Sequence, residues 1–403
     1  MKVLMSAYAC EPDKGSEPGA GWNWVLAAAR NHDVWVMTRA NNRDAIEASL
    51  ARDPVPSLRF EYLDLPAWAR FWKRGPRGVR LYYLLWQALA GRRARQLHAQ
   101  HRFDVVHHIT FANVWLPALV WRAKAPFVLG PVGGGPRVPL GLYRILGLRG
   151  AARELLLVAG RALSRLNPLA RAGWRRAAVI LVQNEETSAA LPRRYRARTL
   201  VRPNASATTL RPPDVSSDGA RGPVAIYAGR LLPWKGVTLA VRALEHLPRW
   251  TLLIVGRGPD EGRIKDLTSR LGLEHRVRCL PWLPREDLWS VMGACSALVL
   301  PSLREDASLV AAEAQSLGLP VVAFDQGGPA ALAHATHARF ELVPLGAAEE
   351  CVTGLARALG RVEEAPPPST IPDFGLRGIS EDLDRVYGQL AGTTPAANLE
   401  VSA

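Results

Sequence analysis

Two glutamates, Glu305 and Glu313, stand eight positions apart in the stretch EDASLVAAE. The apolar run 297–300 just before them is typical of a buried strand. From Leu309 onward the apolar spacing becomes helical, and Ser308 is placed to cap that helix. The two carboxylates should therefore lie near the carboxyl end of a parallel sheet, where open α/β folds bind their ligands. We expect both acids to face a ligand; the alternative is one solvated acid and one acid near a helix cap.

Two cations occupy a comparable position in the stretch YAGRLLPWKG, residues 227–236. A predicted strand ends at Tyr227, Gly229 and Arg230 follow, and Lys235 stands just before a helix. This arrangement suits a diphosphate, because arginine binds phosphate oxygens in pairs, lysine adds a point charge and glycine lets the backbone come close. Cations at the start of a helix oppose its dipole, so an anion between them would lower the free energy. Two solvated bases are the alternative.

The length and composition of the chain limit the classes of protein to which it can belong. A chain of 403 residues exceeds one ordinary hydrophobic core and suggests two domains, and 48% hydrophobic residues suit a globular enzyme. No apolar run approaches the roughly 18 residues of a membrane-spanning helix, and residues 1–8 are expected to form a strand rather than a signal peptide. The four cysteines (Cys10, Cys279, Cys295, Cys351) lack disulfide or zinc spacing, so we expect a cytoplasmic protein.

The charge balance is strongly basic, with 51 lysines and arginines against 36 acidic residues and a net charge of +15. Much of the excess is arginine between residues 70 and 198. Such a balance favours anionic partners, whether a membrane surface, nucleic acid or phosphorylated substrates. An arginine-rich composition inherited from a GC-rich genome is the alternative.

Strands and helices alternate along both halves, which predicts an α/β fold with doubly wound parallel sheets. In the first half, strands are expected at 2–7, 34–38, 58–63, 104–110, 127–130 and 179–182, with a glycine-rich loop at 10–21 and a helix at 22–30. In the second half, strands are expected at 224–227, 251–255, 277–280, 297–300, 321–324 and 340–343, with helices at 236–247 and 380–390. The polar stretch that follows Arg202, Pro203 and Asn204 is the candidate hinge, and 363–372 is a proline-rich link.

Two segments, 66–100 and 140–176, interrupt this alternation with interleaved aromatic and basic residues. Residues of this kind can lie at a membrane interface. They can equally form ordinary helices that cover the sheet and line an acceptor cleft. We favour the cleft, because neither segment has a sustained polar face opposite an apolar one.

Several spaced motifs together resemble the retaining nucleotide-sugar glycosyltransferases of family 4. They are YAGRLLPWKG, LLIVGRGPD, the E-x7-E pair and PVVAFDQGGP, joined in the first half by SAYACEPDKGSEPGAGW, DVVHHIT and GPVGGG. The resemblance implies the GT-B architecture, in which two Rossmann-like domains face across a cleft. We expect an acceptor-side domain at 1–203, a donor-binding domain at 204–377, and a helix at 378–392 that crosses back onto the first domain.

The resemblance also implies roles for single residues. Arg230 and Lys235 would hold the donor diphosphate and neutralise the leaving group, as a metal does in other transferases. Glu305 would hydrogen-bond the hydroxyls of the donor sugar and Glu313 those of the ribose. The backbone amides of Ser308, Leu309 and Val310 at a helix N-terminus would add to diphosphate binding, and Gly19, Gly21 and Gly229 would let the backbone approach the phosphates. Asn204 matches the asparagine of the family's hinge motif.

The sequence also departs from the family's pattern. The usual D-x-x-H-x-H strand has Ile109 at the second histidine position, and the histidines here are His107 and His108. They face opposite sides of a strand, so only one is expected to enter the cleft, where it would bind the donor sugar or the acceptor. The usual acid of VGDGP is Arg257, and EGFG reads EDAS at 305–308. We expect these changes to affect the choice of sugar rather than the reaction.

The sequence shows neither a D-x-D motif after a strand nor a clustered His/Cys/Asp set with ligand spacing, so no metal and no cofactor are expected. We predict a retaining hexosyltransferase that uses a UDP-sugar first and a GDP-sugar second, in cell-surface glycan or glycolipid synthesis. Its expected partners are the donor and a hydroxyl-bearing acceptor, with peripheral contact to an anionic membrane and no nucleic acid. Tailoring of a soluble metabolite such as an antibiotic is the alternative. Rivals of other classes are a nucleotide-sugar epimerase and a non-catalytic basic surface binder.

Overall fold

The computed structural model describes residues 1–69, 78–111, 113–205, 222–336, 339–364 and 375–392. The chain divides into two compact units. Unit 1 contains residues 1–135, 161–204 and the C-terminal segment from Gly375, and unit 2 contains residues 136–160 and 205–374. Residues 136–160 were expected in the first domain but group with the second. The predicted polar hinge stretch and most of the proline-rich link lie outside the described residues.

Unit 1 is built on a seven-stranded parallel sheet with the order β3-β2-β1-β4-β5-β6-β7. The strands are β1 (Lys2–Ala7), β2 (Asp33–Arg39), β3 (Leu58–Leu63), β4 (Val105–Thr110), β5 (Phe127–Val132), β6 (Val179–Val182) and β7 (Thr199–Val201). The helices are α1 (Ser16–Ala29), α2 (Arg43–Arg52), α3 (Val79–His101), α5 (Pro168–Arg176), α6 (Glu185–Ala190) and α13 (Leu376–Leu390), and the end of α4 (Tyr143–Ser164) joins them. The order reverses between β1 and β4, as in doubly wound folds.

Alternate residues of these strands fill two cores. One core takes Leu4, Val106, Leu129 and Ile180 against α3 and α5, and the other takes Val3, Val105, Val128 and Val179 against α1 and α13. This period of two is what a sheet covered on both faces requires.

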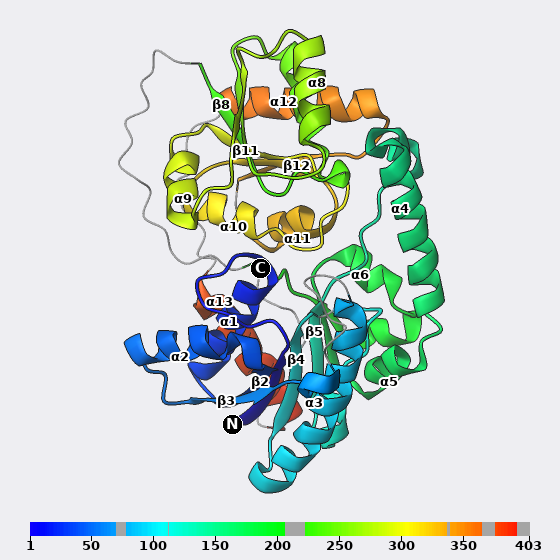
Figure 1. Ribbon diagram of the computed structural model, residues 1–403, viewed down its shortest axis with the longest axis vertical. Coiled ribbons are helices and arrows are strands. Elements are labelled where there is room, and N and C mark those ends of the chain that lie inside the picture. The colour runs from blue at the N-terminus through cyan, green and yellow to red at the C-terminus, as the bar shows by residue number, and fades with distance from the viewer. Residues whose placement is uncertain (70–77, 112, 206–221, 337–338, 365–374, 393–403) are drawn as a thin grey trace. The chain divides into compact units, whose positions relative to one another are not determined.

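Helix α13 belongs to unit 1 although it comes last in the chain, and it packs beside α1 (Figure 1). Its apolar face includes Leu383 and Tyr387. The Asp382 carboxylate forms an ion pair with Arg202, 2.6 Å from its Nε, and both side chains are largely buried. These contacts attach the final helix to the end of the unit 1 sheet.

Unit 2 is built on a six-stranded parallel sheet with the order β10-β9-β8-β11-β12-β13. The strands are β8 (Val224–Ala228), β9 (Thr251–Val255), β10 (Val277–Leu280), β11 (Ala297–Leu300), β12 (Val321–Phe324) and β13 (Phe340–Val343). The helices are α7 (Val237–Ala243), α8 (Glu261–Arg270), α9 (Arg285–Gly293), α10 (Leu309–Ser316), α11 (Gly327–Ala335) and α12 (Ala348–Glu364). The strand order reverses between β8 and β11.

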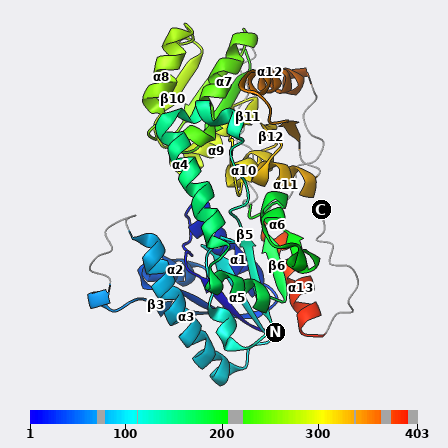
Figure 2. The ribbon, with the colours of Figure 1, turned by 90° about the vertical axis from the view of Figure 1, so that its right-hand side faces the viewer.

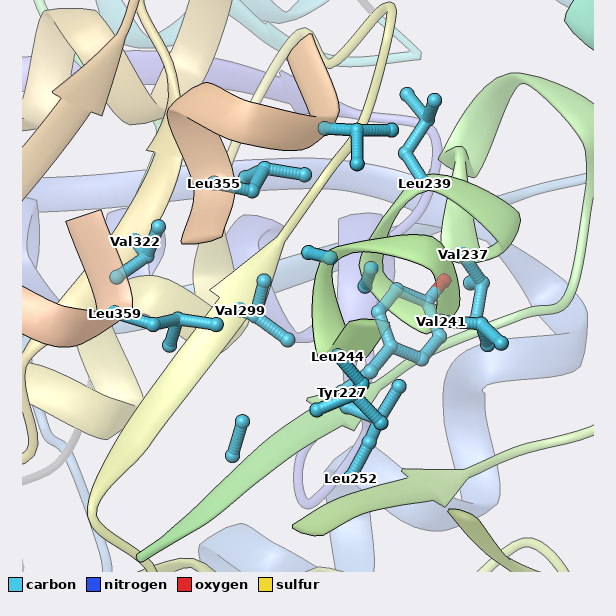
Figure 3. Packing of buried hydrophobic residues seen from close by; sticks show 14 of the residues in the cluster. Tyr227, Val237, Leu239, Val241, Leu244, Leu252, Val299, Val322, Leu355 and Leu359 are labelled. Carbon is cyan, nitrogen blue, oxygen red and sulfur yellow. The ribbon is translucent and has the colours of Figure 1, made fainter. Parts of the chain in front are cut away.

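The unit 2 sheet is also covered on both faces. Tyr227, Val299 and Val322 point to one face, where they pack with α7 and α12, as Figure 3 shows. These two helices lie side by side (Figure 2). The intervening strand residues, such as Ile226 and Leu298, pack on the other face with α10. The two sheets confirm the predicted α/β fold of two doubly wound parallel-sheet units.

Some local expectations were wrong. Helix α1 begins at Ser16 rather than at Trp22, because Glu17 and Pro18 are favourable in a first helical turn. Strand β7 was not predicted, since it has only three residues and an arginine-rich turn before it. Helix α7 stops at Ala243 and continues as a 3-10 turn to His246.

Candidate functional site

The predicted cation loop and the predicted acid loop meet at the point where the unit 2 strand order reverses. Lys235 follows β8 and Glu305 follows β11, which are neighbours in the sheet. The Lys235 ammonium group forms an ion pair with the Glu305 carboxylate, and both side chains are mostly buried. Open α/β sheets bind ligands at this position, outside the carboxyl ends of the strands. The anion that we expected beside Lys235 is therefore supplied by the chain itself.

One backbone hydrogen bond joins the two loops, and a side-chain hydrogen bond holds the cation loop itself. The Leu303 amide donates to the Trp234 carbonyl at 2.8 Å, and the Tyr227 hydroxyl donates to the Arg230 carbonyl at 2.9 Å. The Arg230 side chain is exposed, and in the described part of the chain its guanidinium forms no ion pair. The site thus combines one cation that is ion-paired, Lys235, with one that has no carboxylate partner among the described residues, Arg230.

Gly236 lets the Lys235 loop turn tightly against the β11 loop. Its φ is +64°, and a Cβ at this position would lie 2.1 Å from the Pro301 carbonyl oxygen. Any other residue at this position would be strained by the positive φ. Its Cβ would also force the backbone at Pro301 to move.

We expect Gly236→Ala to lower the free energy of unfolding by about 1–3 kcal/mol or more. Urea unfolding of the variant measures the change, and Gly262→Ala is the matched control. Gly262 lies in α8 with nothing within 4 Å of its added Cβ, so that variant should be neutral or slightly more stable. Equal stabilities of the two variants would contradict the close approach.

The start of α10 presents a polar group that has no partner among the residues that the structure describes. Ser308 precedes the helix as predicted, but its side chain makes no capping hydrogen bond. Its hydroxyl is buried and unpartnered among the described residues. The first amides of α10, on Leu309 and Val310, have no helical acceptor by position, so this end of the helix favours an anion.

Glu313 lies one turn further along α10 and is buried. Its carboxylate accepts from Arg285, at 2.9 Å from Nε and 2.6 Å from Nη2. Burial raises the pKa of Glu313, and the charge of Arg285 opposes that rise. The Arg285 guanidinium also lies 4.9 Å from the centre of the Trp289 ring. Sequence reasoning missed Arg285, because it is 28 residues from Glu313 and no local motif connects them.

A second group that sequence reasoning missed surrounds Trp234. The guanidinium groups of Arg153 and Arg304 each lie 4.9 Å from its ring centre. Arg304 also pairs with the buried Glu154 at 3.4 Å. Trp234 directly precedes Lys235 and Arg304 directly precedes Glu305 in the sequence. This adjacency to predicted site residues could have pointed to both of them. The first part of α4 therefore supports the loop that carries Lys235.

The two histidines of β4 lie inside unit 1, with exposed fractions of 0% for His107 and 1% for His108. His107 Nδ1 is 2.6 Å from the Tyr387 hydroxyl, and its Nε2 is 2.7 Å from the Gly130 carbonyl oxygen, to which it must donate. His108 contacts the hydroxyls of Ser6 and Tyr83, each at 3.2 Å. The structure gives both rings internal partners, and a role in substrate binding stays a prediction for either.

Burial lowers the pKa of His107 and His108 to about 3. Both are therefore neutral in the folded state at pH values where the unfolded chain, with a histidine pKa near 6.5, binds protons. The free energy of unfolding that these two neutral rings contribute should be fully present above about pH 6.5. Below that pH it should fall by about 1.4 kcal/mol per pH unit for each histidine. Urea unfolding between pH 7 and pH 5 measures this slope. A flat profile would contradict two neutral buried rings.

Two of the predicted glycines, Gly19 and Gly21, and Asn204 serve packing within unit 1, whereas Gly229 lies in unit 2. Gly19 and Gly21 lie inside α1, and a Cβ would meet the Lys14 carbonyl oxygen at 1.8 Å and that of Ala9 at 2.2 Å. The close approach that they allow is thus to the chain's own loop. Asn204 Oδ1 accepts from Trp24 Nε1 at 2.9 Å. Their contribution to donor binding stays a prediction.

Within the described residues, no group of three or more His, Cys, Asp and Glu side chains is arranged to hold a metal. Across the same residues, no helix has both the length and the apolar character needed to cross a bilayer. The expectation of a metal-independent reaction stays a prediction.

The comparison with protein families matches residues 215–363 to the model of "Glycosyl transferases group 1". A D-inositol 3-phosphate glycosyltransferase of Mycobacteroides abscessus is 44% identical over 116 residues, which is 27% of this chain and 26% of that protein. A 2-deoxystreptamine glucosyltransferase of Streptomyces kanamyceticus is 33% identical over 152 residues, 36% of this chain and 38% of that protein. The chain thus spans well under half the length of these relatives.

Solved structures match nearly the whole chain. Sucrose-phosphate synthase from Thermosynechococcus elongatus has a TM-score of 0.62 at 19% identity, covering 98% of this chain and all of that one. HepE from Anabaena, in complex with UDP and glucose, has a TM-score of 0.54 at 18% identity, covering 96% and 99%. At these identities the likeness establishes the fold, which is that of the GT-B glycosyltransferases.

Proposed function

We propose that this chain, whose residues 215–363 belong to the group 1 glycosyltransferases and whose units have the GT-B fold, transfers a sugar from a nucleotide-diphosphate sugar to an acceptor hydroxyl. The observation that carries the proposal is the Lys235–Glu305 pair at the strand-order reversal of unit 2. It joins the two predicted halves of a donor site on neighbouring loops.

In this proposal the cations act on the diphosphate. Lys235 and Arg230 stabilise the negative charge that develops on the leaving phosphate, and this charge grows as the bond to the sugar breaks. The amides at the start of α10 and the unpartnered Ser308 hydroxyl bind further phosphate oxygens. Arg230 is available for this role, because its guanidinium is exposed and forms no ion pair in the described part.

The acids act on hydroxyl groups. Glu305 is fixed by Lys235 and accepts hydrogen bonds from the transferred sugar, and Glu313 is fixed by Arg285 and accepts them from the ribose. Neither acid is assigned a proton-transfer role. The acceptor oxygen bonds to the anomeric carbon on the face that the diphosphate leaves, and the acceptor proton goes to the leaving phosphate oxygen. This course retains the anomeric configuration.

UDP-sugars are the first donor candidates and GDP-sugars the second. The UDP and glucose in the HepE structure support the first choice for this chain. A lipid-linked or glycan acceptor at the inner face of the membrane is the proposed acceptor. The similarity to a 2-deoxystreptamine glucosyltransferase supports a second candidate, transfer to a soluble aglycone.

A thermal-shift panel tests donor binding. A nucleotide sugar that binds only the folded protein at 100 times its dissociation constant adds about 2.7 kcal/mol of stability. We expect UDP-sugars to raise the melting temperature most, with GDP-sugars next and dTDP-sugars as comparison. No shift with any of them would overturn the donor assignment, and product formation without an acceptor would favour an epimerase.

A further inference from the structure

The tryptophan beside Lys235 contacts two arginines that come from other elements of unit 2. Trp234 belongs to the 3-10 turn Pro233–Lys235 and is only partly exposed. The guanidinium of Arg153, on α4, and that of Arg304, in the loop after β11, each lie 4.9 Å from the centre of its ring. Planar guanidinium groups stack on aromatic faces, and the attraction grows when water is excluded. The ring is therefore held by two separate elements.

Arg304 is fixed in turn by a carboxylate. Glu154 follows Arg153 on α4, and its Oε2 is 3.4 Å from Arg304 Nη2. The Glu154 side chain is 2% exposed and that of Arg304 is 12% exposed. A buried ion pair adds little net stability, because desolvation of the two charges offsets their attraction, but separating the partners leaves an unpaired buried charge. The pair therefore restricts where the Arg304 guanidinium can lie.

Lys235 depends on this turn for its position. Its side chain has four rotatable carbon–carbon bonds, and its ion-pair partner in the described part of the chain is Glu305, on a different loop. The backbone of the turn is confined by α4, because a Cβ added at Gly150 would lie 3.5 Å from the Pro233 side chain. Together with the contacts of Trp234, this packing determines the direction in which the lysine leaves the backbone.

We propose that Trp234, Arg304 and Glu154 are positioning residues that hold Lys235 where it stabilises the leaving diphosphate. The inference rests on the proposed transfer reaction, and none of the three residues is assigned a contact with a substrate. A displaced Lys235 loses an interaction that is made mainly in the transition state, so kcat falls more than the donor KM rises. A displacement of about 1 Å can cost on the order of 100-fold in rate.

Two substitutions of Trp234 separate positioning from packing. Leucine and phenylalanine are both large and apolar, but only phenylalanine offers an aromatic face to the guanidinium groups. Trp234→Leu should lower kcat about 10- to 100-fold, and Trp234→Phe should keep it within about threefold. The donor KM of both variants should stay within about threefold of the parent value. Equal kcat in the two variants, or a loss that falls on KM alone, would overturn the positioning role.

Glu154→Gln tests the same contact from α4 and does not alter the aromatic ring. It keeps the shape of the side chain but removes the charge that fixes Arg304, so kcat should fall about tenfold. Arg242→Gln is the matched control, because it breaks the ion pair of α7 with Glu349 in the same unit, 2.7 Å long, and should leave kcat and KM unchanged. Parent-like kcat in Glu154→Gln, or an equal loss in the control, would contradict the proposal.

The deciding measurement combines these changes with Lys235→Ala. In that background Trp234→Leu should lower kcat by no more than about twofold, because the group that Trp234 positions is absent. A further loss of about tenfold would mean that Trp234 acts by another route. Parent-like turnover in Lys235→Ala alone would remove the proposed donor site itself. If Lys235→Ala lost turnover while Trp234→Leu and Glu154→Gln kept theirs, the donor site would stand and the positioning role would be wrong.

Discussion

Replacing Lys235 by alanine is expected to reduce the turnover of sugar transfer by about 100- to 1,000-fold. Lys235 is the ion-paired, partly exposed cation at the strand-order reversal of unit 2, and its proposed task is to stabilise charge that exists mainly in the transition state. Loss of such a group lowers kcat more than it raises KM. Steady-state rates with a saturating donor measure the effect.

The Lys235→Ala protein should remain folded. The ion pair that it loses is partly exposed, so about 1 kcal/mol of stability or less should be lost. Lys265→Ala, at an exposed position of α8, is the control and should transfer sugar like the parent protein. Parent-like turnover in Lys235→Ala would remove the central residue of the proposed site.

The strands were the most predictable part of the fold. Those of unit 2, such as 251–255 and 321–324, have the predicted limits because each is a short β-branched or aliphatic run between breaking residues. Segment 136–160 was placed wrongly, since its membership in unit 2 depends on contacts such as that of Arg304 with Glu154, far apart in sequence. Local periodicity carries no information on pairs of this kind.

The site was predictable in its residue types but not in its pairing. Lys235 and Glu305 were each recognisable, because a charged residue after a buried strand stands out. Their mutual contact follows from the adjacency of β8 and β11, which only the sheet order reveals. The same holds for Arg285, whose importance depends on the packing of α9 against α10. The sequence therefore located the acids and cations, and the topology determined which of them neutralise one another.

Glu313 should make donor binding sensitive to acid. Its proposed task, accepting hydrogen bonds from the ribose, requires the ionised carboxylate, and burial raises the pKa of Glu313 above that of an ordinary glutamate. The donor KM should therefore be lowest at neutral pH and rise as the pH falls through this raised pKa. Glu313→Gln cannot titrate, so its KM should be about 10- to 100-fold higher at neutral pH and flat with pH.

The variant Arg285→Gln tests the same assignment through the pH dependence of the donor KM. The charge of Arg285 holds down the pKa of Glu313, so Arg285→Gln should raise that pKa further and move the loss of donor binding to higher pH. The carboxylate remains in that variant, and kcat with saturating donor at the upper end of the pH range should stay near that of the parent. KM against pH for the parent and both variants separates the outcomes. If Arg285→Gln left the pH profile unmoved, or if Glu313→Gln kept the parent's acid sensitivity, the titrating group would be another residue and Glu313 would not be the ribose contact.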